Sequence, residues 1–383
     1  MILSRILKNL FSQNKAQPSL QMDSGGEPPF FRNEGIPSIL VMTHSYQGNG
    51  AAVMLVFVLE WLVRVRGWQV QALSTELSDG DKKFLKRMGV GLVSAVNPEQ
   101  YDFAICNTVV SGFAYVEQFG HHLPCLLWVH EGEIVLWNSR GALGDWKRIF
   151  SMSKHVVFQT RWQAERIFGS FTSGFMEDQY SVIPNCLPNI PKKSELEAID
   201  GSEKKKIVFI GGVYDRKRPF DLMQAVLKID RSDIECIFVG TTDLLSSEMQ
   251  AVLSRDSRFR VTGEVNRQAA TAILATADVL SLPSGDESQP IVLLEAAALN
   301  VPIVISDLSV HRGIWTHGEN CLVHPVGDVD CLAMHLTTCL AGNAPRPVLP
   351  KNADFSQHTF FDRFEMLFER FLPEKLKHYG EQN

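Results

Sequence analysis

Short apolar runs alternate with longer helical stretches along most of the chain. Helical periodicity covers residues 51–65, 111–119, 160–168, 220–228, 328–340 and 356–371. Between these helices, strand-like runs fall at 38–43, 68–73, 90–94, 102–106, 126–129, 156–158, 207–210, 234–239, 259–262, 279–282 and 301–305. Such alternation predicts parallel sheets that are covered by helices on both faces. The fold class is therefore α/β.

Residues 16–37 and 187–205 each contain several proline, glycine and serine residues, and we interpret both segments as linkers. A chain of 383 residues is long enough for two domains of ordinary size. We expect a tail and linker over 1–37, an N-terminal domain over 38–190 and an interdomain linker over 191–205. A C-terminal domain would follow over 206–352, and residues 353–383 would include a final helix.

Composition excludes several functional classes. The formal net charge is −6 and there is no long basic run, so a nucleic-acid partner is not expected. The seven cysteines are scattered without a C-x-x-C pair, which favours a reducing, cytoplasmic compartment over disulfides or a zinc site. No run of 18 uncharged apolar residues occurs, so the sequence predicts no spanning helix.

The first fifteen residues form an amphipathic pattern. Apolar side chains at positions 3, 6, 7 and 10 share one helical face, with basic residues at 5, 8 and 15 on other faces. This segment suits peripheral contact with the inner face of a membrane. A loosely ordered tail is the alternative, and the pattern does not decide between them.

The stretch 279–306 predicts a strand–loop–helix–strand unit. Pro290 suits a first helical position, because it lacks an N–H that would be unpaired there. The helix start, with Ile291 and Val292, offers N–H groups and partial positive charge to a phosphate. Glu287 and Glu295 would then accept hydrogen bonds from sugar hydroxyls. Two solvated carboxylates on an ordinary crossover remain the alternative.

A second such unit opens the N-terminal domain. Gly48 and Gly50 lie between a strand and a helix, where glycine lets the backbone approach a ligand. The loop is not G-x-G-x-x-G, and no acidic residue closes the second strand, so a nicotinamide cofactor is disfavoured. A tight turn needed only for packing is the alternative.

The pattern Pro-Ser…Glu…Pro-x4-Glu-Ala-Ala…Pro-x-Val within 279–306 resembles the retaining GT-B glycosyltransferases (glycosyl transferases group 1, or family 4). The resemblance covers about residues 38–371. It implies two Rossmann-like, doubly wound domains that face a central cleft. It also implies transfer of a sugar, with retention, from a UDP- or GDP-sugar to a saccharide or lipid-linked acceptor. Cell-surface polysaccharide or lipopolysaccharide synthesis would be the setting, without cofactor or metal.

The resemblance assigns roles to particular residues. His130 would contact the donor sugar, Glu287 would hold it, and Lys217 would bind the diphosphate. Glu295 would bind the ribose, while Glu131 and Glu133 would face the acceptor. Other donor contacts would come from Gly48, Gly50, Gly211, Gly212, Gly263, Val265, Pro290, Ile291 and Val292, with the loop at Gly263 and Val265 next to the base.

The chain departs from the family pattern at two loops. Gly212 stands where arginine is common, so Arg216 or Arg218 would supply the guanidinium, and spacing does not decide which. Cys186 replaces a glycine in the segment Tyr180–Cys186. These departures leave open an inactive nucleotide-sugar-binding subunit, and a GT-B epimerase is the alternative among enzymes.

Overall fold

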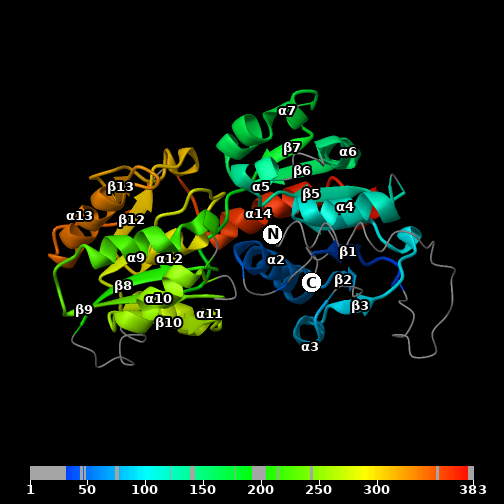
Figure 1. The fold of residues 1–383 in the computed structure, drawn as a ribbon. Helices are drawn as coiled ribbons and strands as arrows, with labels where there is room; N and C mark the ends of the chain where they lie inside the picture. Colours follow the sequence, from blue (N-terminus) through cyan, green and yellow to red (C-terminus); the bar gives the residue numbers. More distant parts are fainter. Residues whose placement is uncertain are drawn as a thin grey trace.

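A computed structural model of the chain describes residues 32–43, 46, 49–73, 77–120, 122–138, 143–176, 178–191, 204–213, 215–241, 245–350 and 353–377. Two parallel sheets stand side by side, each between layers of helices (Figure 1). We call the part built on β1–β7 the N-terminal domain and the part built on β8–β13 the C-terminal domain. The predicted α/β class, with two Rossmann-like domains, is confirmed.

The N-terminal domain contains a seven-stranded sheet in the order β3-β2-β1-β4-β5-β6-β7. Its strands are β1 (Ser38–Met42), β2 (Gln69–Leu73), β3 (Gly91–Val93), β4 (Phe103–Asn107), β5 (Cys125–Trp128), β6 (His155–Phe158) and β7 (Tyr180–Val182). Every residue of β1 and β4 is buried, whereas burial alternates along β2. Central parallel strands are covered on both faces, which is why β1 and β4 read as continuous apolar runs.

Helices connect these parallel strands along the chain. They are α2 (Gly50–Glu60), α3 (Asp79–Met88), α4 (Val109–Gln118), α5 (Glu133–Asn138), α6 (Leu143–Met152) and α7 (Gly169–Thr172), with π-helical turns at Trp61–Val65 and Gln163–Ile167. The helix predicted over 160–168 is therefore mainly a π-helical turn. Asn49 caps α2, since its side chain accepts a hydrogen bond from the Ala52 N–H at 2.8 Å.

The C-terminal domain contains a six-stranded sheet in the order β10-β9-β8-β11-β12-β13. Its strands are β8 (Lys205–Ile210), β9 (Ile234–Val239), β10 (Phe259–Gly263), β11 (Val279–Leu282), β12 (Ile303–Ser306) and β13 (Leu322–His324). Its helices are α9 (Pro219–Leu227), α10 (Ser247–Arg255), α11 (Arg267–Ala275), α12 (Ile291–Ala298) and α13 (Val329–Leu340). The strand predicted over 301–305 begins two residues later, after Pro302.

Strand order reverses between β1 and β4 in one sheet and between β8 and β11 in the other. Ligands of open α/β sheets bind at such switch points, beyond the carboxyl ends of the strands. The segments that follow β8 and β11 carry Lys217 and Glu287, and Asn107 is the last residue of β4. Both switch points therefore present polar side chains.

The last long helix, α14 (Gln357–Phe368), lies against the N-terminal domain, although it follows the C-terminal domain in sequence (Figure 1, red). Phe364 is fully buried, with its ring centroid 4.8 Å from that of Trp128 on β5. Phe368 lies 5.3 Å from Phe103 on β4. These aromatic contacts complete one of the domain's two apolar clusters.

No helix in the described part of the chain is long and apolar enough to cross a membrane. The amphipathic segment 1–15, for which peripheral membrane contact was predicted, lies outside the described residues.

Candidate functional site

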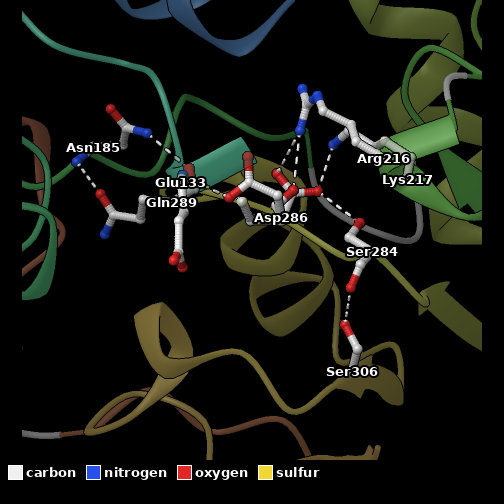
Figure 2. A network of polar contacts seen from close by, with 9 residues as sticks. Glu133, Asn185, Arg216, Lys217, Ser284, Asp286, Gln289 and Ser306 are labelled. Carbon is white, nitrogen blue, oxygen red and sulfur yellow. Dashed lines mark hydrogen bonds and ion pairs between the residues drawn. The ribbon is translucent and has the colours of Figure 1, made fainter. Parts of the chain in front are cut away.

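Lys217 and Glu287 form a buried ion pair at the switch point of the C-terminal domain (Figure 2). Lys217 Nζ lies 2.7 Å from Glu287 Oε1, and the two side chains are only 12% and 7% exposed. Ser284 Oγ donates a hydrogen bond to the same carboxylate oxygen at 2.7 Å. Burial opposes ionisation of Glu287, but nearby charges outweigh it, so its pKa lies below the usual value. The carboxylate is therefore held in its charged form.

Arg216, rather than Arg218, faces this carboxylate. Arg216 NH1 lies 3.8 Å from Glu287 Oε2 and donates a hydrogen bond to the Asp286 carbonyl oxygen at 3.0 Å. Arg218 is engaged elsewhere, because its Nε lies 2.5 Å from Asp221 Oδ2. Of the two candidate arginines, Arg216 is thus the one that lies beside Glu287.

Gly211 has a backbone φ of +142°, which L side chains rarely adopt. A Cβ added there would lie 3.5 Å from Cε of Lys217. A Cβ at Gly240, on the neighbouring loop after β9, would lie 2.3 Å from the Gly211 carbonyl oxygen. The loop after β9 therefore approaches Gly211 too closely for a side chain at Gly240, whereas a Cβ at Gly211 would make ordinary contact with the Lys217 stem.

Pro290 precedes α12 and is not its first helical residue, which corrects the prediction. Its ψ is 115°, in the extended region, and the helix begins at Ile291. The proline ring sets φ at −67°, which suits a residue that leads into a helix. A Cβ added at Gly50 would lie 3.6 Å from Ile291 Cδ1, so the starts of α2 and α12 meet between the domains. Gly48 lies outside the described residues.

The loop 285–290 contacts the N-terminal domain through Asp286. Its Oδ1 accepts a hydrogen bond from the Glu133 N–H at 2.9 Å (Figure 2). A Cβ added at Gly132 would lie 2.3 Å from the same oxygen, so a side chain at that position would displace the Asp286 carboxylate. Burial raises the pKa of Asp286 to about 6, although Arg216 lowers it in part.

His130 follows β5, at the carboxyl edge of the N-terminal sheet. Its Nε2 lies 2.9 Å from Asn107 Oδ1, and its Nδ1 lies 2.6 Å from Gln159 Nε2. The ring centroid is 4.7 Å from that of Trp128. Both ring nitrogens therefore have protein partners that the sequence did not reveal.

Glu131 does not face an acceptor, which corrects the prediction. It is 7% exposed, and its carboxylate accepts hydrogen bonds from the Val109 N–H at 2.8 Å and the His130 N–H at 3.0 Å. The N–H groups at the start of α4 therefore help to hold this carboxylate in a buried position. Glu133 is exposed.

We expect Glu131→Gln to change the pH dependence of stability. Burial raises the pKa of Glu131 from 4.5 to about 7, despite hydrogen bonds that lower it. Between those values the folded chain keeps a proton that the unfolded chain has lost, so stability falls as pH rises. Glu131→Gln cannot lose this proton, so its stability should not fall in the same way. The free energy of unfolding of the variant minus that of the natural chain should therefore increase by about 3 kcal/mol as the pH rises from the lower to the higher pKa. Urea titrations at several pH values measure this difference, and a constant difference would contradict the assignment.

Arg267 pairs with the candidate residue Glu295, a contact that was not predicted from the sequence. Its NH2 and Nε lie 2.7 Å and 3.1 Å from Glu295 Oε1. Its guanidinium carbon is 5.7 Å from the ring centroid of Phe57 on α2, in the other domain. Arg267 is the first residue of α11, directly after the loop of Gly263 and Val265, which was the available signal.

Gly263 and Val265 lie at and just beyond the end of a strand that is not adjacent to the strand leading to Glu287. Gly263 ends β10, which β9 and β8 separate from β11. The site is thus an extended edge that runs from β10 to β11. No group of three or more His, Cys, Asp or Glu side chains suited to a metal ion occurs within the described ranges.

Residues 204–342 match the family model described as Glycosyl transferases group 1. The phosphatidyl-myo-inositol mannosyltransferase of Mycobacterium leprae is 29% identical over 216 residues, 54% of each chain. A putative teichuronic acid biosynthesis glycosyltransferase of Bacillus subtilis is 23% identical over 223 residues, which are 56% of this chain and 54% of that protein. The chain spans about half the length of these curated relatives.

Solved structures resemble the whole fold. Sucrose-phosphate synthase from Thermosynechococcus elongatus has a TM-score of 0.68 at 16% identity, covering 88% of this chain and 98% of that one. The Anabaena protein HepE, in complex with UDP-glucose, has a TM-score of 0.67 at 17% identity, covering 87% and 99%. The family match thus covers the C-terminal domain, and the solved structures share the two-domain GT-B architecture with the chain.

Proposed function

We propose that the protein transfers a sugar from a nucleotide-diphosphate donor to a hydroxyl of a saccharide or lipid-linked acceptor, with retention at the anomeric carbon. The observation that carries this proposal is the cluster of Lys217, Arg216 and Glu287 at one switch point, opposite the start of α2. Fixed cations at that place match a diphosphate leaving group, whose negative charge grows as the sugar departs.

In the proposed reaction the bond between the anomeric carbon and a diphosphate oxygen breaks. The acceptor oxygen bonds to the same face of that carbon, and its proton passes to a diphosphate oxygen. Lys217 and Arg216 would stabilise the departing diphosphate, as preorganised charges stabilise other developing anions. Glu287 and His130 would orient the sugar, and Glu295 would bind the ribose.

The relatives support a role in building cell-surface polysaccharides. One is named for teichuronic acid biosynthesis, and a lipopolysaccharide outer core galactosyltransferase shares the fold with a TM-score of 0.60 at 14% identity. HepE was solved with UDP-glucose, so UDP-sugars come first in a donor screen and GDP-sugars second. We place the proposed reaction at the inner membrane face, where lipid-linked acceptors are elongated.

The test is release of nucleoside diphosphate from a panel of UDP- and GDP-sugars, with and without saccharide and lipid-linked acceptors. Acceptor-dependent release with a matching glycosylated product supports the proposal. Donor binding in calorimetry without release across all acceptors would identify a binding subunit instead. Acceptor-independent conversion of the donor sugar to its epimer would identify an epimerase.

We expect Glu295→Ala and His130→Ala to separate donor binding from transfer. Loss of a hydrogen bond to a charged group costs about 1.5–3 kcal/mol, so Glu295→Ala should weaken donor binding roughly 10–100-fold. His130→Ala should lower kcat by about 100-fold, because a misplaced sugar is poorly aligned for attack. Calorimetry and single-turnover kinetics measure the two effects. Unchanged kinetics in both variants would contradict the site assignment.

A further inference from the structure

A continuous chain of hydrogen bonds links the loop 285–290 to the ring of His130. The Asn185 N–H donates to Gln289 Oε1 at 2.6 Å, and Asn185 Nδ2 donates to the Gln289 carbonyl oxygen at 2.9 Å (Figure 2). Gln159 Nε2 lies 3.0 Å from Asn185 Oδ1 and 2.6 Å from His130 Nδ1. The chain therefore starts in the C-terminal domain and ends at the proposed sugar contact.

The chain of hydrogen bonds continues past His130 to the start of α2. His130 Nε2 lies 2.9 Å from Asn107 Oδ1, and Asn107 Nδ2 donates to the Ala51 carbonyl oxygen at 3.3 Å. Ala51 belongs to the first turn of α2, which meets α12 between the domains. One end of this hydrogen-bond chain thus lies on the loop 285–290 and the other on the first turn of α2, and both border the proposed donor site.

The direction of every link is determined, because both ends are backbone carbonyls and can only accept. The Gln289 carbonyl requires the amide nitrogen of Asn185, which turns Asn185 Oδ1 toward Gln159. Gln159 must then present its amide nitrogen, whose two hydrogens serve Asn185 Oδ1 and His130 Nδ1. His130 Nδ1 accepts, so the ring proton resides on Nε2.

The contacts of Asn107, at the other end of the hydrogen-bond chain, independently place the ring proton on Nε2. The Ala51 carbonyl requires the amide nitrogen of Asn107, which leaves Asn107 Oδ1 to accept from His130 Nε2. A proton on Nε2 satisfies this contact. Both halves of the chain therefore select one tautomer of the ring.

The amide side chains of this chain are removed from water. Gln159 and Asn185 are each 2% exposed, Asn107 is fully buried, and Gln289 is 8% exposed. A buried polar group that loses its partner is not rescued by solvent, so a break at one link disturbs the next. The carbonyl oxygen of Gln159 is itself buried without a partner among the described residues, a cost of placing its nitrogen toward both neighbours.

We propose that Gln159 and Asn185 are positioning residues through which contact of loop 285–290 with the N-terminal domain fixes the orientation and tautomer of His130. When Gln289 leaves Asn185, the Asn185 amide is no longer required to keep its direction, so Gln159 stops constraining Nδ1 and only the contact with Asn107 still favours the proton on Nε2. Closure of the domains would thus prepare His130 as it forms the donor site. The effect on sugar transfer rests on the proposed function, whereas the coupling to the ring does not.

The coupling is tested by NMR of protein labelled with ¹⁵N in its histidines, with the His130 signals assigned from the spectrum of His130→Ala. The natural protein should show the proton on Nε2. Gln159→Glu keeps the shape of the side chain but places a carboxylate against Nδ1 while Asn107 Oδ1 still accepts from Nε2, so Nδ1 should gain a proton and the ring should become doubly protonated. Asn185→Ala removes one of the two constraints, so a minor population with the proton on Nδ1 should appear beside the Nε2 tautomer that Asn107 favours.

Gln357→Ala is the matched control. Gln357 Nε2 also donates to an asparagine oxygen, Asn189 Oδ1 at 3.0 Å, but this pair lies outside the chain that leads to His130. Gln357→Ala should show the His130 ring proton on Nε2, as in the natural protein. A natural protein with the proton on Nδ1, or unchanged His130 signals in both Gln159→Glu and Asn185→Ala, would overturn the proposal.

Once a donor is known, enzyme kinetics provide a second test of the proposal. Asn185→Ala should lower kcat by about tenfold or more while the donor Kd stays within about twofold, as expected for a group that acts through another in the transition state. Equal losses in kcat and in donor binding would overturn the positioning role. If the natural protein transfers no sugar, the proposed function fails, and the NMR result still decides the coupling.

Discussion

Lys217→Ala should lower kcat by about 100- to 1,000-fold, the usual effect of removing one preorganised group that stabilises a developing anion. Lys217 Nζ is the closest cation to Glu287, at 2.7 Å, whereas Arg216 lies 3.8 Å from that carboxylate. Without Lys217, the departing diphosphate would have only Arg216 and the helix starts to stabilise its charge. Single-turnover sugar transfer at saturating donor measures the loss.

The control for this prediction separates chemistry from folding. Lys217→Ala also leaves Glu287 buried without its main partner, and such an uncompensated charge can destabilise a fold by about 3–5 kcal/mol. The double variant Lys217→Ala/Glu287→Gln removes that charge and should recover thermal stability without recovering activity. Wild-type kcat in folded Lys217→Ala would show that the lysine has no part in transfer.

Phe364→Ala should destabilise the N-terminal domain by about 3–5 kcal/mol, the typical cost of a Phe→Ala change in a packed core. Phe364 is fully buried, and its ring contacts Trp128, Phe360 and Phe368 at centroid distances of 4.8, 5.0 and 5.4 Å. The alanine leaves a cavity where α14 meets the sheet. Urea unfolding, followed by tryptophan fluorescence, measures the change because Trp128 lies at that contact.

Met366→Ala is the matched control, since Met366 lies on the same helix and is 70% exposed. Its unfolding free energy should stay within about 0.5 kcal/mol of the natural protein. Similar stabilities for Phe364→Ala and Met366→Ala would show that α14 is not part of the domain's core.

The sequence predicted the fold class because its signals are local. Buried strands such as Val279–Leu282 are short and mostly apolar, and the structure has that strand at the predicted residues. Boundaries were less certain where helix geometry changes, as in the π-helical turn Gln163–Ile167. The same local reasoning placed Lys217 and Glu287 on loops after β8 and β11, which become neighbours only through sheet order.

The partners of the predicted residues could not be found in this way. Arg267 meets Glu295 from a different helix, and Gln159 meets His130 from a different strand end. No spacing along the chain encodes these pairs. Glu131 was misjudged for a related reason, since its environment is set by Val109 at the start of α4, 22 positions earlier.

The position of α14 has a consequence for how the protein is made. Its aromatic residues complete the cluster around Trp61, Trp68 and Phe103, yet the ribosome reaches Gln357–Phe368 only after the whole C-terminal domain has been translated. Until then, the nascent N-terminal domain exposes an apolar face that invites aggregation. Chaperone binding during synthesis is therefore expected to concentrate on this face and to end when α14 docks.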